Sequence, residues 1–164
     1  MERTGRARLL PDDVDTDQIL PGEYLNTVDE AELGQYVLNG YDESFADTID
    51  DGDILVAGRN FGLGSSREAA PVAIRNANVG AVVAESFARI FYRNAINVGL
   101  PIAEVPGITN HVSEGDTVRV DIETGVVENR TTGERFEMAA LPPDLLEILD
   151  AGGLVAYRRH ADDS

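Results

Sequence analysis

The segment Ala57-Gly58-Arg59-Asn60-Phe61-Gly62-Leu63-Gly64-Ser65-Ser66-Arg67-Glu68-Ala69-Ala70-Pro71 decides how this chain folds. A short apolar run at residues 53–56 precedes it, and a run with helical character at residues 72–77 follows it. The pattern therefore predicts a strand, a glycine-rich turn and the beginning of a helix. Gly62 and Gly64 permit positive φ angles or a close approach to a ligand. The N–H groups and dipole of the following helix favour an anion at this turn.

Two hydroxyl groups and a guanidinium follow these glycines, at Ser65, Ser66 and Arg67. Arg67 is suited to binding a carboxylate through two parallel hydrogen bonds. Ser65 and Ser66 offer hydroxyl groups for hydrogen bonding or for proton transfer. The turn is therefore a candidate site for binding a carboxylate and moving a proton.

A purely structural role for the serines is the alternative. Ser65 and Glu68 have the spacing of a capping box, in which Ser65 bonds the N–H of residue 68 and Glu68 reaches back. Pro71 favours a helix that begins later, near residues 67 to 70, because a proline six residues into a helix is costly. A later start leaves the Gly-Ser-Ser segment as an exposed loop.

The length of 164 residues is sufficient for one buried core, and we expect a single domain over residues 1–164. No apolar run approaches about eighteen residues, and the amino terminus leads into no signal-like segment, which predicts a cytoplasmic protein that does not enter a membrane. The chain contains no cysteine, so another chain must supply any iron–sulfur cluster. His111 and His160 lack the spacing of metal ligands, and we expect no metal site.

The charge is strongly negative, with 30 acidic residues against 13 basic ones and a net charge of −17. Such a surface repels phosphate backbones and disfavours nucleic-acid binding. All the basic residues are arginine, and this acidic, lysine-free composition resembles that of proteins from salt-loving organisms. We expect lower stability in ordinary buffer, with a Debye length of about 8 Å, than in molar salt, with one of roughly 3 Å.

Four aspartates lie between residues 12 and 17, flanked by turn-forming residues. They cannot all be buried, so this segment is predicted to be a surface loop. A divalent-metal loop is disfavoured because the glycine and distal glutamate of an EF-hand are missing. Asp17 borders an apolar pair and is placed to orient an arginine or a substrate hydroxyl.

The apolar pattern predicts two kinds of sheet. A strand–helix–strand–helix–strand order from residue 53 to residue 105 predicts a parallel sheet with right-handed crossovers, and Phe87 and Phe91 are predicted to lie in its core. Alternating residues after Pro106-Gly107 predict an antiparallel meander and hence a mixed, barrel-like sheet. Further predicted elements are a helical patch at 29–37, a loop with a partial turn at 41–52 and a strand at 79–84. A helix is expected at 86–97, and a last helix at 145–151 is stopped by Gly152-Gly153. Residues 7–10 form a short apolar segment.

Three separated motifs together resemble the aconitase swivelling-domain family: Gly58-Arg59-Asn60-Phe61-Gly62-Leu63-Gly64-Ser65-Ser66-Arg67-Glu68, Ala84-Glu85-Ser86-Phe87-Ala88-Arg89-Ile90-Phe91-Tyr92-Arg93-Asn94, and Asp15-Thr16-Asp17. Within this family the chain is most similar to free-standing small subunits of 3-isopropylmalate dehydratases, and the resemblance covers nearly the whole chain. It implies an α/β fold, a swivelling β/β/α barrel-like domain.

In that family the domain closes over a [4Fe–4S] cluster held by a large subunit, and the pair dehydrates and rehydrates a hydroxy-polycarboxylate. The resemblance implies that Ser65 is the base that removes a proton next to a carboxylate. It implies that Ser66 and Arg67 bind substrate carboxylate oxygens and that Asp17 orients groups or handles protons. A serine base needs a lowered pKa, for which Arg67, the loop N–H groups and the partner's cluster are the available electrostatic help.

The chain departs from the family pattern at three positions. A cysteine usually stands where Leu63 lies and a histidine where Ala69 lies, and both differences concern packing of the loop more than activity. Aconitase and homoaconitase relatives place an arginine at the position of Asn26 to bind an extra carboxylate, a contact that a neutral amide cannot make. We therefore expect Asn26 to face the substrate and the substrate to be isopropylmalate, in leucine biosynthesis.

Three alternatives remain. The first is a homoaconitase or related hydro-lyase small subunit. The second is a phosphate-binding module without catalysis, although the turn lacks the lysine of a P-loop and the third glycine of a dinucleotide fingerprint. The third is a non-catalytic interaction domain, if Leu63 and Ala69 signal decay; retention of Ser65, Ser66 and Arg67 argues against it.

Overall fold

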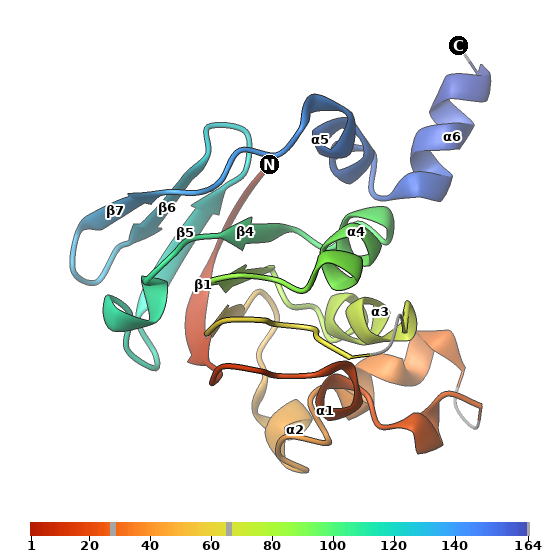
Figure 1. The fold of residues 1–164 in the computed structure, drawn as a ribbon, viewed down its shortest axis with the longest axis horizontal. Helices are drawn as coiled ribbons and strands as arrows, with labels where there is room; N and C mark the ends of the chain where they lie inside the picture. The colour runs from red at the N-terminus through yellow and green to blue at the C-terminus, as the bar shows by residue number, and fades with distance from the viewer. Residues whose placement is uncertain (27–28, 65–66, 164) are drawn as a thin grey trace.

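The computed structural model of the chain describes residues 1–26, 29–64 and 67–163, with side chains as far as Arg159. A mixed, curled sheet of seven strands runs through this part in the order β4-β3-β2-β1-β5-β6-β7 (Figure 1). The strands are β1 (Glu2–Leu9), β2 (Ile54–Ala57), β3 (Ala81–Ala84), β4 (Ile102–Glu104), β5 (Thr117–Asp121), β6 (Val126–Asn129) and β7 (Glu134–Glu137). The sheet confirms the predicted combination of a parallel half and an antiparallel half.

The helices surround the parallel half, and α5 and α6 close the chain (Figure 1). They are α1 (Thr16–Ile19), α2 (Phe45–Thr48), α3 (Ala69–Asn76), α4 (Arg89–Asn97), α5 (Pro143–Asp150) and α6 (Leu154–Asp163), with 3₁₀ turns η1 (Gly22–Tyr24), η2 (Glu30–Tyr36) and η3 (Ile108–Asn110). None of the helices in the described ranges is both long and apolar enough to cross a bilayer.

Strand β1 lies at the centre of the sheet. It is parallel to β2, with Leu9 opposite Val56, and antiparallel to β5, with Arg3 opposite Val120. Strands β2 and β3 are buried on both faces, which explains their unbroken apolar sequences. Strand β5 alternates buried and more exposed residues because only one of its faces packs on the core.

Four details differ from the sequence prediction. The helical patch at 29–37 is a 3₁₀ turn, held where Gly34 approaches the backbone of Asn76 so closely that an added Cβ would lie 2.5 Å away. The partial turn predicted within the loop at 41–52 is a short helix, α2, and the apolar segment at 7–10 overlaps the end of a longer strand, β1, that begins at Glu2. After Gly152 and Gly153, both with positive φ, the chain forms α6, which was not predicted.

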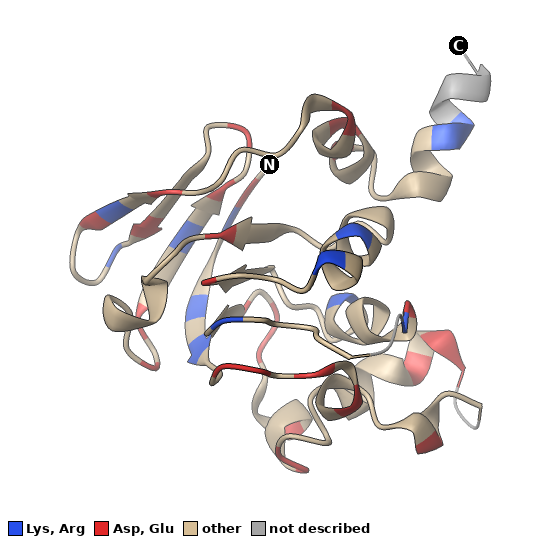
Figure 2. Cartoon of the chain, in the orientation of Figure 1, with Lys and Arg blue, Asp and Glu red and all other residues tan. Residues whose placement is uncertain are grey.

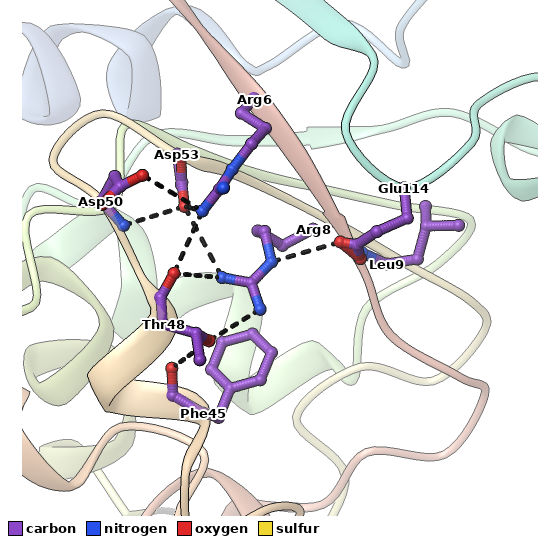
Figure 3. A network of polar contacts seen from close by, with 8 residues as sticks. All are labelled: Arg6, Arg8, Leu9, Phe45, Thr48, Asp50, Asp53 and Glu114. Carbon is purple, nitrogen blue, oxygen red and sulfur yellow. Dashed lines mark hydrogen bonds and ion pairs between the residues drawn. The ribbon is translucent and has the colours of Figure 1, made fainter.

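A buried carboxylate holds α2 against the sheet (Figure 3). Asp53, just before β2, is 3% exposed, and its Oδ2 lies 2.9 Å from Nη2 of Arg6 and 3.7 Å from Nη1 of Arg8. Both arginines also donate to the carbonyl oxygen of Thr48, at 3.0 and 2.8 Å. The guanidinium of Arg8 lies over the Phe45 ring, 4.7 Å from its centroid. This network joins β1, α2 and the beginning of β2.

Candidate active site

The three sequence motifs lie at one edge of the parallel sheet. Residues 10–17 follow β1, residues 58–64 follow β2 and residues 85–88 follow β3, and these strands are adjacent and parallel. Open parallel sheets bind ligands beyond the carboxyl ends of their strands. The fold therefore brings together the segments that the sequence marked separately.

The glycine-rich loop is bound on one side to the aspartate segment. The N–H of Gly62 donates to the carbonyl of Val14 at 2.7 Å, and the N–H of Thr16 donates to the carbonyl of Leu63 at 2.9 Å. These bonds form a short parallel bridge between Asp15 and Leu63. The loop is thus held at a fixed place relative to α1.

On its other side the loop is bound to the segment before α4. Phe61 donates its N–H to the carbonyl of Ser86 at 3.1 Å and accepts from the N–H of Ala88 at 3.0 Å. Because residues 86–88 make these bonds, α4 begins at Arg89, three residues later than predicted. Phe61, Phe87 and Phe91 form a ring cluster with centroid distances of 5.2 to 6.1 Å. The core position predicted for Phe91 is confirmed, whereas Phe87 is only partly buried and packs against the core from its edge.

Two glycines are required by this packing. Gly62 has φ of +85°, and an added Cβ would overlap the ring of Phe91. Gly64 has φ of +110°, and a Cβ there would lie 3.2 Å from Oγ1 of Thr16. Both the backbone conformation and the space explain why glycine stands at these positions.

An ion pair connects the loop to α1. Oδ1 of Asp17 lies 3.0 Å from Nη1 of Arg67, and the same nitrogen donates to the carbonyl of Leu20 at 3.2 Å. The N–H of Gly22 donates to Asp17 at 3.3 Å. The Arg67 hydrogen bond, aided by that of Gly22, holds the pKa of the Asp17 carboxyl below its usual range. The prediction that Asp17 orients an arginine is consistent with this geometry, and the Arg67 side chain, 28% exposed, remains accessible to a ligand.

The other aspartates of this segment are engaged by the protein itself. Each accepts a hydrogen bond at 2.7 to 3.0 Å, and the pairs are Asp12 with the Arg59 N–H, Asp13 with the Asn60 amide and Asp15 with the Gln18 N–H. Among the described residues there is no group of three acidic, histidine or cysteine side chains that could hold a metal ion. The loop therefore has a structural explanation that needs no cation.

Ser65 and Ser66 lie outside the described residues, so their predicted roles remain predictions. Their neighbours bear on the capping-box alternative: Arg67 is not helical, and α3 begins at Ala69 with Glu68 as its N-cap. A helix with Ser65 as its N-cap would have to begin at residue 66, so that alternative is wrong. The later start predicted from Pro71 is confirmed.

Asn26 lies in the exposed turn after η1. This turn is steadied by the stacked rings of Tyr24 and Tyr36, whose centroids are 4.1 Å apart. Next to Asn26, Leu25 lines a cleft of about 490 Å³ that also borders the end of the glycine-rich segment. The cleft walls include Leu25, Leu33, Glu68, Ala69 and Val72. Asn26 is exposed and its predicted contact with the substrate remains a prediction.

Sequence reasoning missed two backbone groups of the site. The carbonyl of Leu20 and the N–H of Gly22 hold Arg67 and Asp17, and a Cβ on Gly22 would lie 3.5 Å from Nη2 of Arg67. Backbone contacts leave little trace in a sequence. The Pro21-Gly22 turn beside the aspartates was the available signal.

Comparisons with known proteins agree with this arrangement. The family model "Aconitase C-terminal domain" matches residues 3–105, the part that contains all three motifs. The "3-isopropylmalate dehydratase small subunit" of Aquifex aeolicus is 49% identical over 160 residues, covering 97% of this chain and 95% of that protein. The "Isopropylmalate/citramalate isomerase small subunit" of Methanocaldococcus jannaschii is 52% identical over 153 residues, covering 93% and 91%.

A solved structure is similar over the same extent. The crystal structure of a 3-isopropylmalate dehydratase from Methanocaldococcus jannaschii matches with a TM-score of 0.93 and 44% identity, covering 99% of this chain and 96% of that one. The similarity includes β5 to β7 and the last two helices, which lie beyond the family model. The predicted fold class, a barrel-like α/β swivelling domain, is confirmed.

Proposed function

The chain belongs to the aconitase C-terminal domain family, and we propose on this premise that it is the small subunit of a 3-isopropylmalate dehydratase. The enzyme is a hydro-lyase of leucine biosynthesis that interconverts 2-isopropylmalate and 3-isopropylmalate by removing and adding water. The observation that supports this most strongly is identity of about half the residues with relatives of that name over nearly the whole chain. Asp17 and Arg67, paired beside the glycine-rich loop, give the assignment a physical basis.

The reaction requires removal of a proton from the carbon next to a carboxylate. Arg67 is the group that would bind the carboxylate, because its planar guanidinium matches two oxygens at once. Asp17 would orient Arg67 and balance its charge in the absence of substrate. Ser65 would take the proton, Ser66 would bind a carboxylate oxygen, and the positive charge of Arg67 would stabilise the deprotonated serine.

The residues of this chain do not fit an iron–sulfur cluster, because the chain contains no cysteine to ligate one. We therefore assign the [4Fe–4S] cluster, and with it the departure of the hydroxyl group, to a large subunit. This chain's share of the reaction is to hold the carboxylate and move the proton. Residues 1–164 would act together as one swivelling unit, in the cytoplasm, without contact to nucleic acid or membrane.

The variable arm of the substrate would lie near the turn that contains Asn26. An asparagine provides no positive charge for a second carboxylate, which favours a branched aliphatic arm over the carboxylate arm of homoaconitate. The adjoining cleft is mixed, with apolar walls at Leu25, Leu33 and Val72 and charged ones at Glu30, Glu68 and Arg75. Citramalate is a further candidate, because the name of one relative includes it.

The experiment is reconstitution with the large subunit of the same organism under anaerobic conditions and in molar salt. Isomerisation of 3-isopropylmalate is measured for the pair and for each subunit alone, with homoaconitate and citramalate as competing substrates. We expect activity only for the pair and the highest kcat/KM for isopropylmalate. A pair that prefers homoaconitate would favour the alternative hydro-lyase, and a chain that binds no large subunit would be a non-catalytic module.

A further inference from the structure

We propose that one face of α4 is the docking surface for an acidic patch of the cluster-bearing large subunit. This inference rests on the proposed function. The surface, here the α4 surface, consists of Arg89, Ile90 and Arg93 together with a neighbouring hollow of about 480 Å³ whose walls include Phe87, Tyr92 and Leu145.

Charge is the first argument. Most arginines of the described part pair with an acidic side chain, as Arg119 does with Glu2 at 2.7 Å. Arg89 and Arg93 are exposed and form no ion pair within that part, although the chain has 30 acidic residues. They stand one turn apart on α4, where like charges repel each other. An acidic partner would remove this repulsion.

Figure 2 shows the same contrast in space. The two basic bands of α4 lie together, whereas acidic residues are spread over the strands and loops of the sheet and over the segments around α1 and α2. A further basic band lies on α6 (Figure 2). A negatively charged molecule approaching this chain is therefore repelled by most of its surface and attracted by α4 and the nearby basic part of α6.

The chemistry of the surface is the second argument. Ile90, between the two arginines, is 53% exposed, one of the few large apolar side chains with such exposure in the described part. The neighbouring hollow has aromatic and apolar walls, and its own carboxylate, Glu104, already accepts a hydrogen bond from the Phe87 N–H at 3.2 Å. Burial raises the pKa of Tyr92, so its phenol remains a neutral hydrogen-bond donor. Arginine and aromatic residues around an apolar centre are typical of protein interfaces.

Position is the third argument. The backbone of Phe61 is bonded to Ser86 and to Ala88, the residue just before α4. The glycine-rich loop and the α4 surface therefore belong to one connected unit. A large subunit that brings its cluster to the substrate beside Arg67 must cover this edge of the sheet. The same large subunit would then extend over the α4 surface, which adjoins that edge.

The test measures binding of the large subunit to immobilised small subunit, with the cluster-free large subunit as a second analyte so that binding is read independently of activity. The variants are Arg89→Ala/Arg93→Ala and the charge reversal Arg89→Glu/Arg93→Glu. Alanine at exposed helix positions preserves α4. The matched control, Arg130→Ala/Arg135→Ala, removes two exposed arginines from β6 and β7 instead.

We expect the alanine pair to raise Kd about tenfold or more and the reversal to raise it further, with kcat at saturating large subunit within about threefold of wild type. The dependence of log Kd on log salt concentration becomes shallower in the alanine variant and is unchanged in the control. Unchanged Kd in the reversal variant, with an active wild-type pair, overturns the docking surface and leaves the proposed function intact.

Two other outcomes are also decisive. If the wild-type chain binds no large subunit and supports no isomerisation, the proposed function fails and the docking surface fails with it. If the reversal alters self-association of the isolated chain by sedimentation and not binding of the large subunit, the face is an interface between copies of this chain, and the proposal is overturned.

Discussion

Asp17 and Arg67, 50 residues apart in sequence, share a hydrogen bond of 3.0 Å between Oδ1 and Nη1. Each residue follows a different parallel strand, so the bond forms only when β1 and β2 are in register. The carboxylate is more exposed than the guanidinium, with 71% against 28% of the side chain accessible. The pair therefore serves to orient Arg67 more than to stabilise the fold.

The first prediction concerns the titration of Asp17. Because Arg67 is the main cause of its lowered pKa, Arg67→Gln should raise the Asp17 pKa toward its ordinary value of about 4. A carboxyl with a lowered pKa in the folded state contributes stability above the unfolded pKa and loses it as the pH falls through the folded pKa. Carbon-13 NMR of the carboxyl groups measures the shift. Asp42, whose pKa is lowered by Ser44, is the internal control and should not change.

The second prediction is kinetic. In the reconstituted pair, Ser65→Ala should lower kcat by on the order of 10² or more and change KM much less, because it removes a proton-transfer group. Ser113→Ala, an exposed hydroxyl in the loop before β5, is the control and should leave both constants unchanged. Wild-type turnover in Ser65→Ala would exclude this serine as the base.

The third prediction concerns the substrate arm. Asn26→Arg should shift preference from isopropylmalate toward homoaconitate by about 10- to 100-fold, because a partly buried charge-assisted pair contributes roughly 1.5–3 kcal/mol. The measurement is the ratio of kcat/KM for the two substrates with one large subunit in molar salt. Thr124→Arg adds the same charge at the β5–β6 turn and should leave the ratio alone. If Asn26→Arg leaves the ratio of kcat/KM values unchanged, this turn does not contact the variable arm of the substrate.

The fourth prediction separates space from backbone strain at two glycines. Gly62→Ala should lower the free energy of unfolding by about 2–5 kcal/mol. The positive φ accounts for about 1–2 kcal/mol of this loss, and overlap with the Phe91 ring adds about 1–3 kcal/mol. Gly133→Ala, with φ of +83° and open space around it, should cost only the strain. Urea unfolding measures both. Equal losses would mean that Phe91 moves aside, and the ring cluster would not fix the loop.

The fifth prediction compares two aspartates that contact the same arginine. Asp53→Asn should lower the free energy of unfolding by roughly 2 kcal/mol or more, because Asp53 is 3% exposed and neutralising it leaves Arg6 and Arg8 without their shared anion. Asp50→Asn, at a side chain 77% exposed, should have little effect. Similar losses in the two variants would contradict the role of burial.

Sequence patterns predicted the elements whose apolar periodicity is unambiguous. The apolar run at 79–84 forms β3, which is buried on both faces. The alternating residues at 115–122 form β5, which buries only one face, so both strands lie where they were expected. Errors occurred where tertiary contacts override local preference. Residues 86–88 have helical spacing but bind Phe61, and Gly152-Gly153 ends one helix and immediately permits another.

The side chains of the candidate site could be singled out from the sequence, but the backbone groups that hold them could not. Arg67 and Asp17 were singled out because a guanidinium and a carboxylate near glycine-rich turns have chemical meaning. The turn at Gly22 and the carbonyl of Leu20 were not, since backbone atoms are the same at every position. The α4 surface could not be predicted either, because a sequence does not show which arginines lack an acidic partner in the folded chain.

The central place of β1 has a consequence for biosynthesis of the chain. This strand is made before its partner β5 and pairs Glu2 with Asp121, so it gains its second neighbour only after more than a hundred further residues have been made. Such distant pairing slows folding. Until β5 emerges, one edge of β1 presents unpaired N–H and C=O groups to any other nascent chain. Products cut short before residue 117 would therefore be prone to aggregate, even though they contain every residue assigned to the active site.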